Sequence, residues 1–532
     1  MKKNFIAGLL LTAVLFLTAT VSTGQNLANR KEIQKLIQTM QIIELAYVDS
    51  VDIQDIVTKT IEQVLKELDP HSAYLSAEEL KKSNEQLEGS FEGIGVTFQI
   101  YHDTILVISP VPGGPSEKLG ILSGDKIVKI NGEDATGKDI NNEWVFDRLR
   151  GKKGTSVDIS IYRGKKDLLD FTIVRDKIPL NSIDASFMAT PEIGYIRLNR
   201  FSKTSQEEFV QSVTDLKSKG MNKLILDLRG NSGGLLNTAF ELADEFLPAG
   251  ELIVYTEGLH NPRKDFYATS LGNFEKGKLV IIIDEASASA SEIVAGAVQD
   301  LDRGIVIGRR SFGKGLVQGP FDLSDGSLIR LTTARYYTPT GRSIQRPYDN
   351  GTEDYYNDFS ERFKHGEYVH ADSIKFPDSL KYKTRAGRIV YGGGGIMPDI
   401  FIPWDSTMFS DYFVELRRKN VLNTFTLDYV EDNRDKINRQ YPGFREFNKE
   451  FKITPDIIRE FKETAEREGV KFDEEGWRAS EALILAQIKA FIARNIWDVN
   501  AFYEVMSEID NEYHRAIDLL EDGQVFGILE RN

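Results

Sequence analysis

Residues 279–300 read LVIIIDEASASASEIVAGAVQD, and this stretch joins an apolar run to a serine-rich turn. The apolar run is typical of a buried strand, and the residues after the turn have apolar positions at helical spacing. The junction carries Ser287, Ser289 and Ser291. Serine often caps the N-terminus of a helix, and capping is one interpretation of this pattern. The other is a nucleophile, because free N–H groups and the helix dipole stabilise negative charge at such a junction.

The alternation of strand and helix continues on both sides of this junction, over residues 179–404. Apolar runs such as NKLILDLRG (222–230) and GIVIGRR (304–310) alternate with helical segments, which predicts an α/β layer. The segment DLRGNSGG (227–234) ends one predicted strand in a glycine-rich turn. The N–H groups of such a turn can form an oxyanion hole or an anion nest. Phosphate binding is the rival interpretation, but no GxxxxGK[ST] pattern accompanies the turn.

A serine nucleophile needs a base, and no histidine of this region lies in a recognisable motif. Lys314 lies between two glycines in the segment GRRSFGKGLVQG (308–319). A lysine accepts a proton only in its neutral form, so burial would have to lower its pKa. A solvated surface lysine is the common alternative. His71, in the turn LDPHSAYL (68–75), is interpreted as a structural residue, because no second histidine lies near it.

The sequence before and after the α/β region has different residue patterns. Residues 90–178 alternate short β-rich runs with Gly/Pro turns, as in GDKIVKINGED (124–134), and predict a small β-rich domain. Residues 25–89 and 405–532 have apolar positions at helical spacing. The second of these helical segments holds 27 Asp and Glu against 18 Lys and Arg, so it carries much of the net charge.

The composition of the whole chain excludes several classes of protein. At 532 residues the chain is too long for one core. It has no cysteine, which excludes disulfides, thiolate metal sites and cysteine nucleophiles. A net charge of −15 argues against a nucleic-acid partner. Two lysines precede an apolar run within residues 1–24, which predicts a signal peptide and an exported, periplasmic protein. An uncleaved membrane anchor is the alternative.

Several motifs together resemble the carboxyl-terminal processing peptidases, or tail-specific proteases, a family of Ser/Lys serine endopeptidases with a PDZ domain. The motifs are SASASEIVAGAVQD, GRRSFGKGLVQ, DLRGNSGG, YVDSVDIQDI, LDPHSAYL, FEGIGV, GILSGDKIVKING, TARYYTPTGRSIQ and GGIMPDI, in the order of the family over about residues 44–402. The resemblance implies an exported endopeptidase that cleaves proteins near their C-termini without a cofactor or metal. Its partners would be proteins or peptides with free C-termini.

The resemblance also implies a multidomain α/β fold. The expected parts are a signal peptide (1–24), an N-terminal helical region (25–89), a PDZ domain (90–178), a crotonase/Clp-like α/β protease core (179–404) and a helical C-terminal extension (405–532). Within the PDZ domain, a glycine-containing loop would take up the carboxylate of the substrate tail. That loop is matched here by Gly93, Ile94, Gly95 and Val96.

The family's catalytic residues map onto positions of the α/β region. Ser289 matches the nucleophile, Lys314 the general base and Gln318 the residue that orients the base. Ser287 and Ser291 are then packing or capping neighbours of the nucleophile. The remaining assignments are Ala290 with Gly233 or Gly234 as backbone donors of the oxyanion hole, and Asp300 as a structural support.

The extension is the main departure from the family, whose members often end soon after the GGIxPD motif. Its segment EALILAQIKAFIARNIW (481–497) has apolar residues over a broad helical face. We therefore expect a packed helical domain that also contributes to self-association, not a solvated tail. Two other classes of protein remain as alternatives, a PDZ-bearing adaptor with inactive chemistry and a crotonase-like acyl-thioester enzyme. The Ser/Lys pair argues against both.

Overall fold

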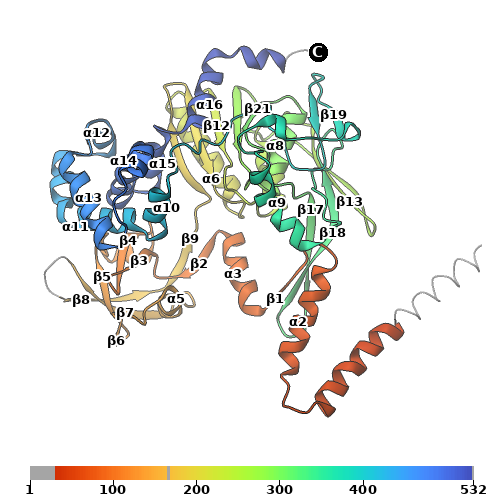
Figure 1. Cartoon of the computed structure of the whole chain (residues 1–532), viewed down its shortest axis with the longest axis horizontal. Helices are drawn as coiled ribbons and strands as arrows, with labels where there is room; N and C mark the ends of the chain where they lie inside the picture. The colour runs from red at the N-terminus through yellow and green to blue at the C-terminus, as the bar shows by residue number, and fades with distance from the viewer. Residues whose placement is uncertain (1–29, 164–167, 530–532) are drawn as a thin grey trace, which may run out of the picture. The chain divides into compact units, whose positions relative to one another are not determined.

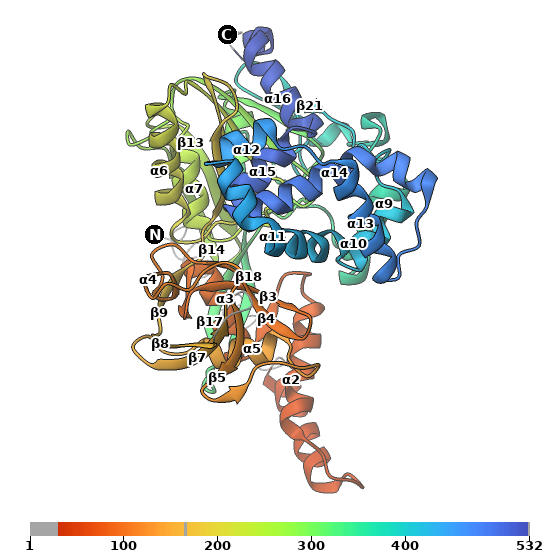
Figure 2. The same ribbon diagram turned by 90° about the vertical axis from the view of Figure 1, so that its left-hand side faces the viewer.

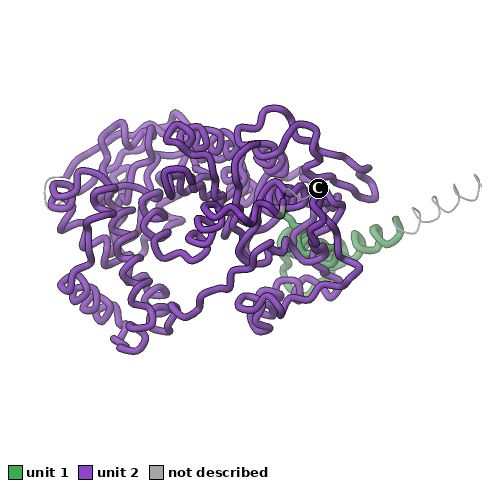
Figure 3. Tube along the Cα trace, turned by 90° about the horizontal axis from the view of Figure 1, so that it is seen from above, with its two compact units in different colours: residues 1–74 green, residues 75–532 purple. Residues whose placement is uncertain are grey.

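A computed structural model describes residues 30–163 and 168–529. The chain divides into two compact units, residues 1–74 and 75–532 (Figure 3). The predicted signal peptide, residues 1–24, lies outside the described residues. Within the described ranges, no helix combines the length and the apolar character needed to cross a membrane.

The described part of the first unit is helical. One helix covers residues 30–46, and α2 follows at Ile53–Lys66. Asp52 caps α2, because its carboxylate accepts the N–H of Asp55 over 3.1 Å. The turn after α2 is closed by Asp69, whose Oδ1 accepts the N–H of His71 over 2.8 Å. His71 thus belongs to a turn whose backbone is held by a carboxylate.

The second unit begins with α3 and the β-rich domain (Figure 1). Strand β2 pairs with β9 in a two-stranded ribbon, and the other strands form a sheet in the order β3-β4-β5-β7-β8, with β6 paired to β5. Strand β3 is therefore an edge strand. The bounds are β1 (Ala73–Leu75), α3 (Ala77–Glu88), β2 (Ser90–Gly93), β3 (Val96–Tyr101), β4 (Thr104–Pro110), α4 (Pro115–Lys118), β5 (Lys126–Ile130), β6 (Glu133–Asp134), α5 (Asn142–Leu149), β7 (Ser156–Tyr162), β8 (Leu168–Val174) and β9 (Asp176–Pro179).

A six-stranded sheet in the order β10-β11-β12-β15-β16-β21 forms the centre of the α/β region. Figure 2 labels its edge strand β21. Its strands from β11 to β21 are parallel, and β10 is antiparallel. The bounds are β10 (Ile183–Met188), β11 (Ile193–Leu198), α6 (Ser205–Ser218), β12 (Lys223–Asp227), α7 (Leu236–Asp244), β15 (Lys278–Ile283), α8 (Ala290–Asp300), β16 (Ile305–Gly308) and β21 (Ile400–Phe401).

The four inner strands β11, β12, β15 and β16 are largely buried on both faces, as parallel strands usually are. Leu224, Leu226 and Ile281 pack with α6, α7 and α8 in one core. Their neighbours Ile225 and Ile282 pack in a second core with helix α16 (Asn511–Asp522). Successive side chains of a strand point to opposite faces, so α16 covers the face opposite α6, α7 and α8.

A second sheet and several short elements complete the α/β region. Strand β18 pairs with β13 and β17, and β13 pairs with β14. The bounds are β13 (Leu252–Gly258), β14 (Asn261–Tyr267), β17 (Leu316–Asp322), β18 (Leu328–Tyr337), α9 (Thr352–Lys364), the 3-10 turns η1 (Ala371–Ser373) and η2 (Asp378–Leu380), β19 (Lys381–Lys383) and β20 (Ile389–Tyr391).

The segment after the α/β region is helical and has a core of its own. The bounds are α10 (Asp411–Arg418), α11 (Val421–Gln440), α12 (Phe444–Glu450), α13 (Pro455–Arg467), α14 (Glu474–Ile496), α15 (Val499–Ser507), α16 and η3 (Gln524–Ile528). The apolar face predicted for residues 481–497 is buried in this core through Leu483, Ile484, Ile488 and Ile492. Since the chain itself covers this face, α14 gives no support to self-association, which stays a prediction.

Helix α11 also packs on the β-rich domain. Leu427 of α11 forms a small apolar cluster with Leu106 and Ile108 of β4. Ile105 and Val107 of the same strand lie in the domain's own core, so α11 covers the outer face of this sheet. The hydroxyl of Tyr101 on β3 donates to Asp428 of α11. The C-terminal helices therefore contact both the β-rich domain and the central sheet.

Candidate active site

Three loops meet at the carboxyl edge of the central sheet. Strands β12, β15 and β16 are parallel neighbours, so the segments that follow them emerge at the same edge. The glycine-rich turn 228–234 follows β12, the serine-rich turn 284–289 follows β15, and the loop 309–315 follows β16. This topology brings together the three motifs that the sequence analysis singled out.

Ser289 caps helix α8 in a strained backbone conformation, with φ 56° and ψ −110°. A positive φ is uncommon for a residue with a side chain and marks positions held by their surroundings. The neighbouring hydroxyls are buried and bonded to the glycine-rich turn. Ser287 Oγ donates to the carbonyl of Leu228 over 2.8 Å, and Ser291 Oγ donates to the carbonyl of Asn231 over 2.8 Å. Ser287 and Ser291 thus anchor the turn on either side of Ser289.

A cavity of about 660 Å³ opens over this edge of the sheet. It is lined by Ser289, Ala290, Gly233, Gly234, Lys314 and Gln318, so six of the residues predicted for the site share one cavity. Leu87, Phe201, Leu236, Ile293, Leu316 and Val317 supply apolar walls. Polar residues, among them Arg200 and Arg330, share these walls, and apolar walls with convergent polar groups are the usual form of a small binding site.

Glu292 ties the serine turn to the lysine loop. Its Oε2 accepts the backbone N–H of Ser289 over 2.8 Å and that of Lys314 over 2.9 Å. Its Oε1 accepts the N–H of Gly313 over 2.7 Å and the hydroxyl of Ser311 over 2.5 Å. The Glu292 side chain is fully buried, and burial raises its pKa, while the hydrogen bonds from Ser311 and the backbone oppose that rise.

Tyr336 on β18 makes a second link between the same two segments. Its hydroxyl lies 2.6 Å from the carbonyl of Lys314 and 3.1 Å from the carbonyl of Ser289. Burial raises the pKa of Tyr336 well above its usual value, so the hydroxyl keeps its proton and remains a donor. The backbones around Ser289 and Lys314 are therefore held both by a carboxylate and by a phenol.

The glycine-rich turn approaches Ser289 closely. A Cβ atom on Gly233, where φ is +102°, would lie 2.8 Å from the Cβ of Ser289 and 3.0 Å from the nitrogen of Ala290. The N–H of Gly233 donates to Asn231 Oδ1 over 2.9 Å. Asn231 in turn donates through Nδ2 to the carbonyl of Leu198 over 2.9 Å. Only glycine fits at position 233.

The other predicted site residues lie elsewhere or make different contacts. Gln318 lines the cavity on β17, and its Nε2 donates to Thr332 Oγ1 over 3.3 Å. Asp300 ends α8, pairs with Arg342 at 2.7 Å and accepts the hydroxyl of Thr340 over 2.7 Å, so its contacts are structural. The residues Gly93, Ile94, Gly95 and Val96 join β2 to β3 in the β-rich domain and do not line the cavity.

Some residues of this site had no role in the sequence analysis. Glu292 follows Ser289 by three positions. A serine with a glutamate three positions later is the pattern of a capping box, so the sequence did carry a signal for Glu292. Tyr336 reaches the site from a distant strand, and no local pattern marks it.

Asp227, at the end of β12, is fully buried between Arg197 and Arg229. Burial alone would raise the pKa of Asp227, but the two arginines lower it far below its usual value.

Comparisons with known proteins agree with this architecture. A family model described as peptidase family S41 matches residues 192–354, and a PDZ domain model matches residues 93–173. A model of a family of unknown function matches residues 412–498 in the helical extension.

Named relatives match a little under two thirds of the chain. The carboxy-terminal-processing protease of Bartonella bacilliformis is 37% identical over 348 residues, which are 64% of this chain and 79% of that protein. The carboxy-terminal processing protease CtpB of Bacillus subtilis is 35% identical over 333 residues, 62% of this chain and 69% of that protein. A solved structure of the PDZ domain of a Vibrio cholerae carboxy-terminal protease, in complex with a peptide, is 34% identical; the match covers 17% of this chain and 99% of that domain, with a TM-score of 0.16.

These matches define a peptidase that carries a PDZ domain. The chain belongs to peptidase family S41, in the group that contains the carboxy-terminal-processing proteases. The resemblance noted in the sequence is thereby confirmed. The predicted fold class is confirmed as well, with a PDZ domain, an α/β peptidase core and a helical C-terminal region.

Proposed function

We propose that this chain is an exported serine endopeptidase that cleaves proteins near their C-termini with a Ser289/Lys314 dyad. The observation that carries the proposal is the shared cavity, which Ser289 and Lys314 both line. The buried carboxylate of Glu292 supports it, because it binds the backbone N–H of each of these two residues. The strained backbone of Ser289 is typical of residues whose position serves a reaction.

The reaction follows the general scheme of covalent peptide hydrolysis. Ser289 Oγ attacks the scissile carbonyl carbon while Lys314 Nζ, in its neutral form, accepts the hydroxyl proton. The protonated Lys314 then gives this proton to the leaving amine as the C–N bond breaks. A water molecule then attacks the acyl carbon while Lys314 accepts a proton from it. The ester C–O bond breaks, Lys314 returns the proton to Ser289 Oγ, and the new carboxyl terminus is released. Gln318 is the residue that we assign to orienting Lys314, from the same cavity wall.

Backbone N–H groups stabilise the oxyanion in this scheme. Ala290 is the first residue of α8, where N–H groups are free of intrahelical partners. The second donor comes from the glycine-rich turn. We assign it to Gly234, because the N–H of Gly233 already donates to Asn231 over 2.9 Å. Such donors typically contribute about 3 kcal/mol each to the stability of the transition state.

The walls of the cavity suggest the class of residue that precedes the cleaved bond. Leu236, Ile293 and Val317 surround the space beside Ser289 and Lys314. An apolar side chain buried against these three residues would gain free energy by leaving water, whereas a charged side chain there would lose its hydration. We therefore propose a preference for small or medium apolar side chains at the cleavage site.

The PDZ domain is proposed to recognise the substrate tail. Its edge strand β3 follows the loop of Gly93–Val96, the geometry used for adding a peptide strand. Carbonyls of the loop are bonded within the domain, since Ile94 O accepts from Ser116 and Gly95 O from Val111. A second cavity of about 630 Å³ touches the domain at Phe91 and Arg150 and shares Leu80 and Asn84 of α3 with the first cavity. A bound chain could pass along α3 from one to the other.

Export is the remaining element of the proposal. It rests on residues 1–24, which have the charged start and apolar run of a signal peptide. Determination of the N-terminus of the mature protein, purified from cell fractions, tests it. A protein recovered in the cytosolic fraction with its N-terminal segment intact would contradict export.

The dyad is tested by substitutions that separate the three serines. Ser289→Ala should abolish cleavage of an unfolded test protein, and labelling by a fluorophosphonate probe should be lost with it. Ser287→Ala and Ser291→Ala are the matched controls and should keep measurable activity. Lys314→Arg should be as inactive as Lys314→Ala, because a guanidinium does not release its proton. Cleavage by Ser289→Ala above a trace rate, or an active Lys314→Arg enzyme, would refute the dyad.

A further inference from the structure

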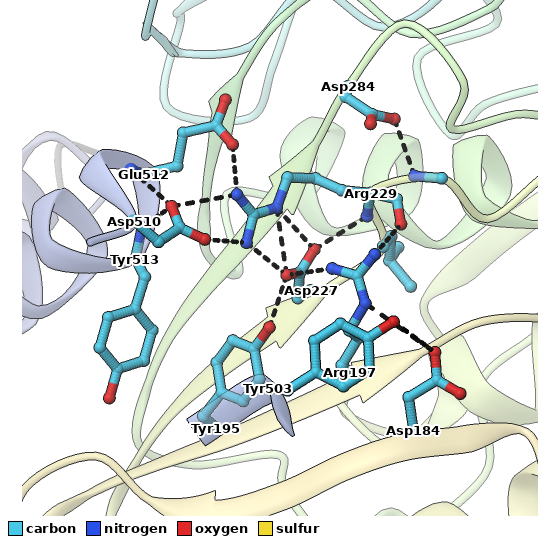
Figure 4. A network of polar contacts seen from close by, with 12 residues as sticks. Asp184, Tyr195, Arg197, Asp227, Arg229, Asp284, Tyr503, Asp510, Glu512 and Tyr513 are labelled. Atoms are coloured by element: carbon cyan, nitrogen blue, oxygen red, sulfur yellow. Dashed lines mark hydrogen bonds and ion pairs between the residues drawn. The ribbon is translucent and has the colours of Figure 1, made fainter. Parts of the chain in front are cut away.

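A buried network of charged side chains lies where helix α16 begins, behind the carboxyl edge of the central sheet (Figure 4). Asp510 caps α16, and its Oδ1 accepts the N–H groups of Glu512 and Tyr513 over 3.0 Å each. The residues 510–522 lie outside all three matched family models. The network is thus a contact between the peptidase core and a part of the chain that none of these three models covers.

Glu512 binds two arginines with its two oxygens. Arg229 Nη1 lies 2.5 Å from Oε2, and Arg309 Nη1 donates to Oε1. Arg229 lies at the start of the glycine-rich turn that follows β12. Arg309 follows β16 and opens the loop that carries Lys314. A single carboxylate of α16 therefore joins the first residues of two loops that surround the cavity.

The third loop is reached through the same arginines. Arg309 Nε donates to Glu285 over 2.8 Å, and Glu285 lies in the turn that leads to Ser289. Asp510 strengthens the contact to Arg229, with Oδ1 and Oδ2 at 3.1 and 2.6 Å from its two terminal nitrogens. The first turn of α16 is consequently connected to all three loops of the candidate active site.

The burial of this network makes each charge depend on its partners. Glu512 is 7% exposed and Arg309 is also 7% exposed. Removing the charge of Glu512 would leave Arg309 with Glu285 alone, and Arg229 with Asp227 and Asp510. Buried arginines that lose a counter-ion move toward other acceptors or toward water. Such movement displaces the loops, and a displacement of about 1 Å at a reacting group costs on the order of 10²-fold in rate.

We propose that Glu512 and Asp510 are positioning residues of the peptidase, through which the C-terminal helix α16 sets the geometry of the three active-site loops. The inference rests on the proposed function, because it takes these loops to carry the reacting groups. In this arrangement α16 contacts neither the substrate nor Ser289. It fixes the arginines that begin the loops, so its loss lowers the rate of the chemical step and leaves substrate binding largely intact.

The test compares matched substitutions in the first turn of α16 of the full chain. Glu512→Gln keeps the shape and removes the charge, and we expect kcat for a peptide substrate to fall at least tenfold while KM stays within twofold. The rate of fluorophosphonate labelling of Ser289 should fall by a similar factor. Glu512→Asp retains the charge and should keep more activity than Glu512→Gln. Asn511→Ala is the control, since Asn511 is exposed. Among the described residues, its side chain is hydrogen-bonded only to Asp405, over 3.4 Å.

The outcomes separate this inference from the proposed dyad. A Glu512→Gln enzyme with unchanged kcat and labelling rate, beside an inactive Ser289→Ala enzyme, would overturn the positioning role alone. An active Ser289→Ala enzyme would overturn the proposed function itself. If Glu512→Gln does not fold, Arg309→Lys tests the positioning role instead. Lysine keeps the charge but cannot bridge Glu285 and Glu512 as a guanidinium does. A folded Arg309→Lys enzyme should show the same loss in kcat at constant KM, and full activity would overturn the inference.

Discussion

Ser289 and Lys314 donate their backbone N–H groups to the same oxygen atom, Oε2 of Glu292, over 2.8 and 2.9 Å. Ser289 precedes Glu292 by three positions and Lys314 follows it by 22, so the carboxylate joins two loops and not one. The relation fixes the separation of the two backbones independently of any contact between the side chains. Four hydrogen bonds, from Ser289, Lys314, Gly313 and Ser311, stabilise this buried carboxylate.

The first prediction follows from this carboxylate. Glu292→Gln places an NH₂ group where one oxygen accepts N–H donors, so at least one backbone donor loses its acceptor. We expect kcat to fall by about 10²-fold or more, and the free energy of unfolding to fall by about 1–3 kcal/mol. Peptide kinetics and urea unfolding measure the two effects. Glu241→Gln makes the same chemical change at an exposed position of α7 and should alter neither quantity.

The second prediction uses the close approach of the glycine-rich turn. Gly233→Ala adds a Cβ at 2.8 Å from the Cβ of Ser289, so it should displace the serine and abolish activity. Gly230→Ala is the control, because Gly230 also has a positive φ, +73°, but the nearest atom to its added Cβ is Arg197 Nη2 at 3.9 Å. Both variants bear backbone strain of about 1 kcal/mol. Equal activity of the two variants in a cleavage assay would show that the contact with Ser289 has no catalytic consequence.

The third prediction concerns the stability of the fold in acid. Arg197 and Arg229 hold the pKa of Asp227 well below its value in the unfolded chain, which is about 3.9. The unfolded chain therefore binds this proton first, and the stabilisation is present above about pH 4 and declines as the pH falls toward the folded-state pKa. Asp227→Asn should lower the free energy of unfolding by about 3–5 kcal/mol at pH 6, and by less at pH 3.

Urea unfolding at the two pH values checks this dependence. The exposed pair of Asp215 and Lys219 supplies the control, because Asp215→Asn should change stability little at either pH. A difference between Asp227→Asn and the native protein that is the same at pH 6 and pH 3 would contradict the assigned charge interaction.

The fourth prediction tests tail recognition by the PDZ domain. A peptide with a free, apolar C-terminus should be cleaved with a higher kcat/KM than the same peptide with an amidated or acidic end, because backbone N–H groups of the Gly93–Val96 loop take up the carboxylate in this mode of binding. The matched peptides differ only at the last residue, and cleavage is followed by mass spectrometry. Equal rates on the free and amidated peptides would argue against a carboxylate-binding loop.

The fifth prediction concerns the helical extension. Truncation after Pro403 removes α16 from the central sheet and α11 from β4 of the PDZ domain, and it exposes Tyr195, Ile225 and Ile282. We expect the truncated chain to lose solubility and to bind an apolar dye. Sedimentation of the full and truncated chains measures whether the extension also contributes to self-association. A truncated protein that stays soluble, folded and active would make the extension dispensable.

The sequence was sufficient for those parts of the site that depend on local patterns. Ser289, Lys314 and the glycine-rich turn each lie next to a strand whose apolar run is unmistakable, and parallel pairing of those strands brings them to one edge. Glu292 had a local signal in the capping-box spacing, but the spacing describes only its bond to Ser289. Its bonds to Lys314 and Ser311 depend on the pairing of β15 with β16, which no local pattern reports.

For the same reason, the contacts of the extension with the rest of the chain could not be predicted from local sequence patterns. The apolar face of residues 481–497 indicated a packed domain, and Leu483 and Ile488 are indeed buried. The surfaces that α11 and α16 cover could not be predicted from periodicity. The spacing of apolar residues shows which face of a helix is buried, but not which other element this face packs against. Asp510 and Glu512 look like ordinary acidic residues at a helix N-terminus, yet they bind Arg229 and Arg309 in the peptidase core.

The bonds of the extension have a consequence for how the protein is made. Tyr101 meets Asp428 across 327 positions of sequence, and Arg229 meets Glu512 across 283. Contacts between such distant segments form late, because both partners must first be synthesised and the long loop between them closed. Until the end of the chain has been made and folded, Arg229 and Arg309 therefore lack the carboxylate of Glu512. Under the positioning role proposed for Glu512, the peptidase reaches full activity only after residue 512 has folded onto the core.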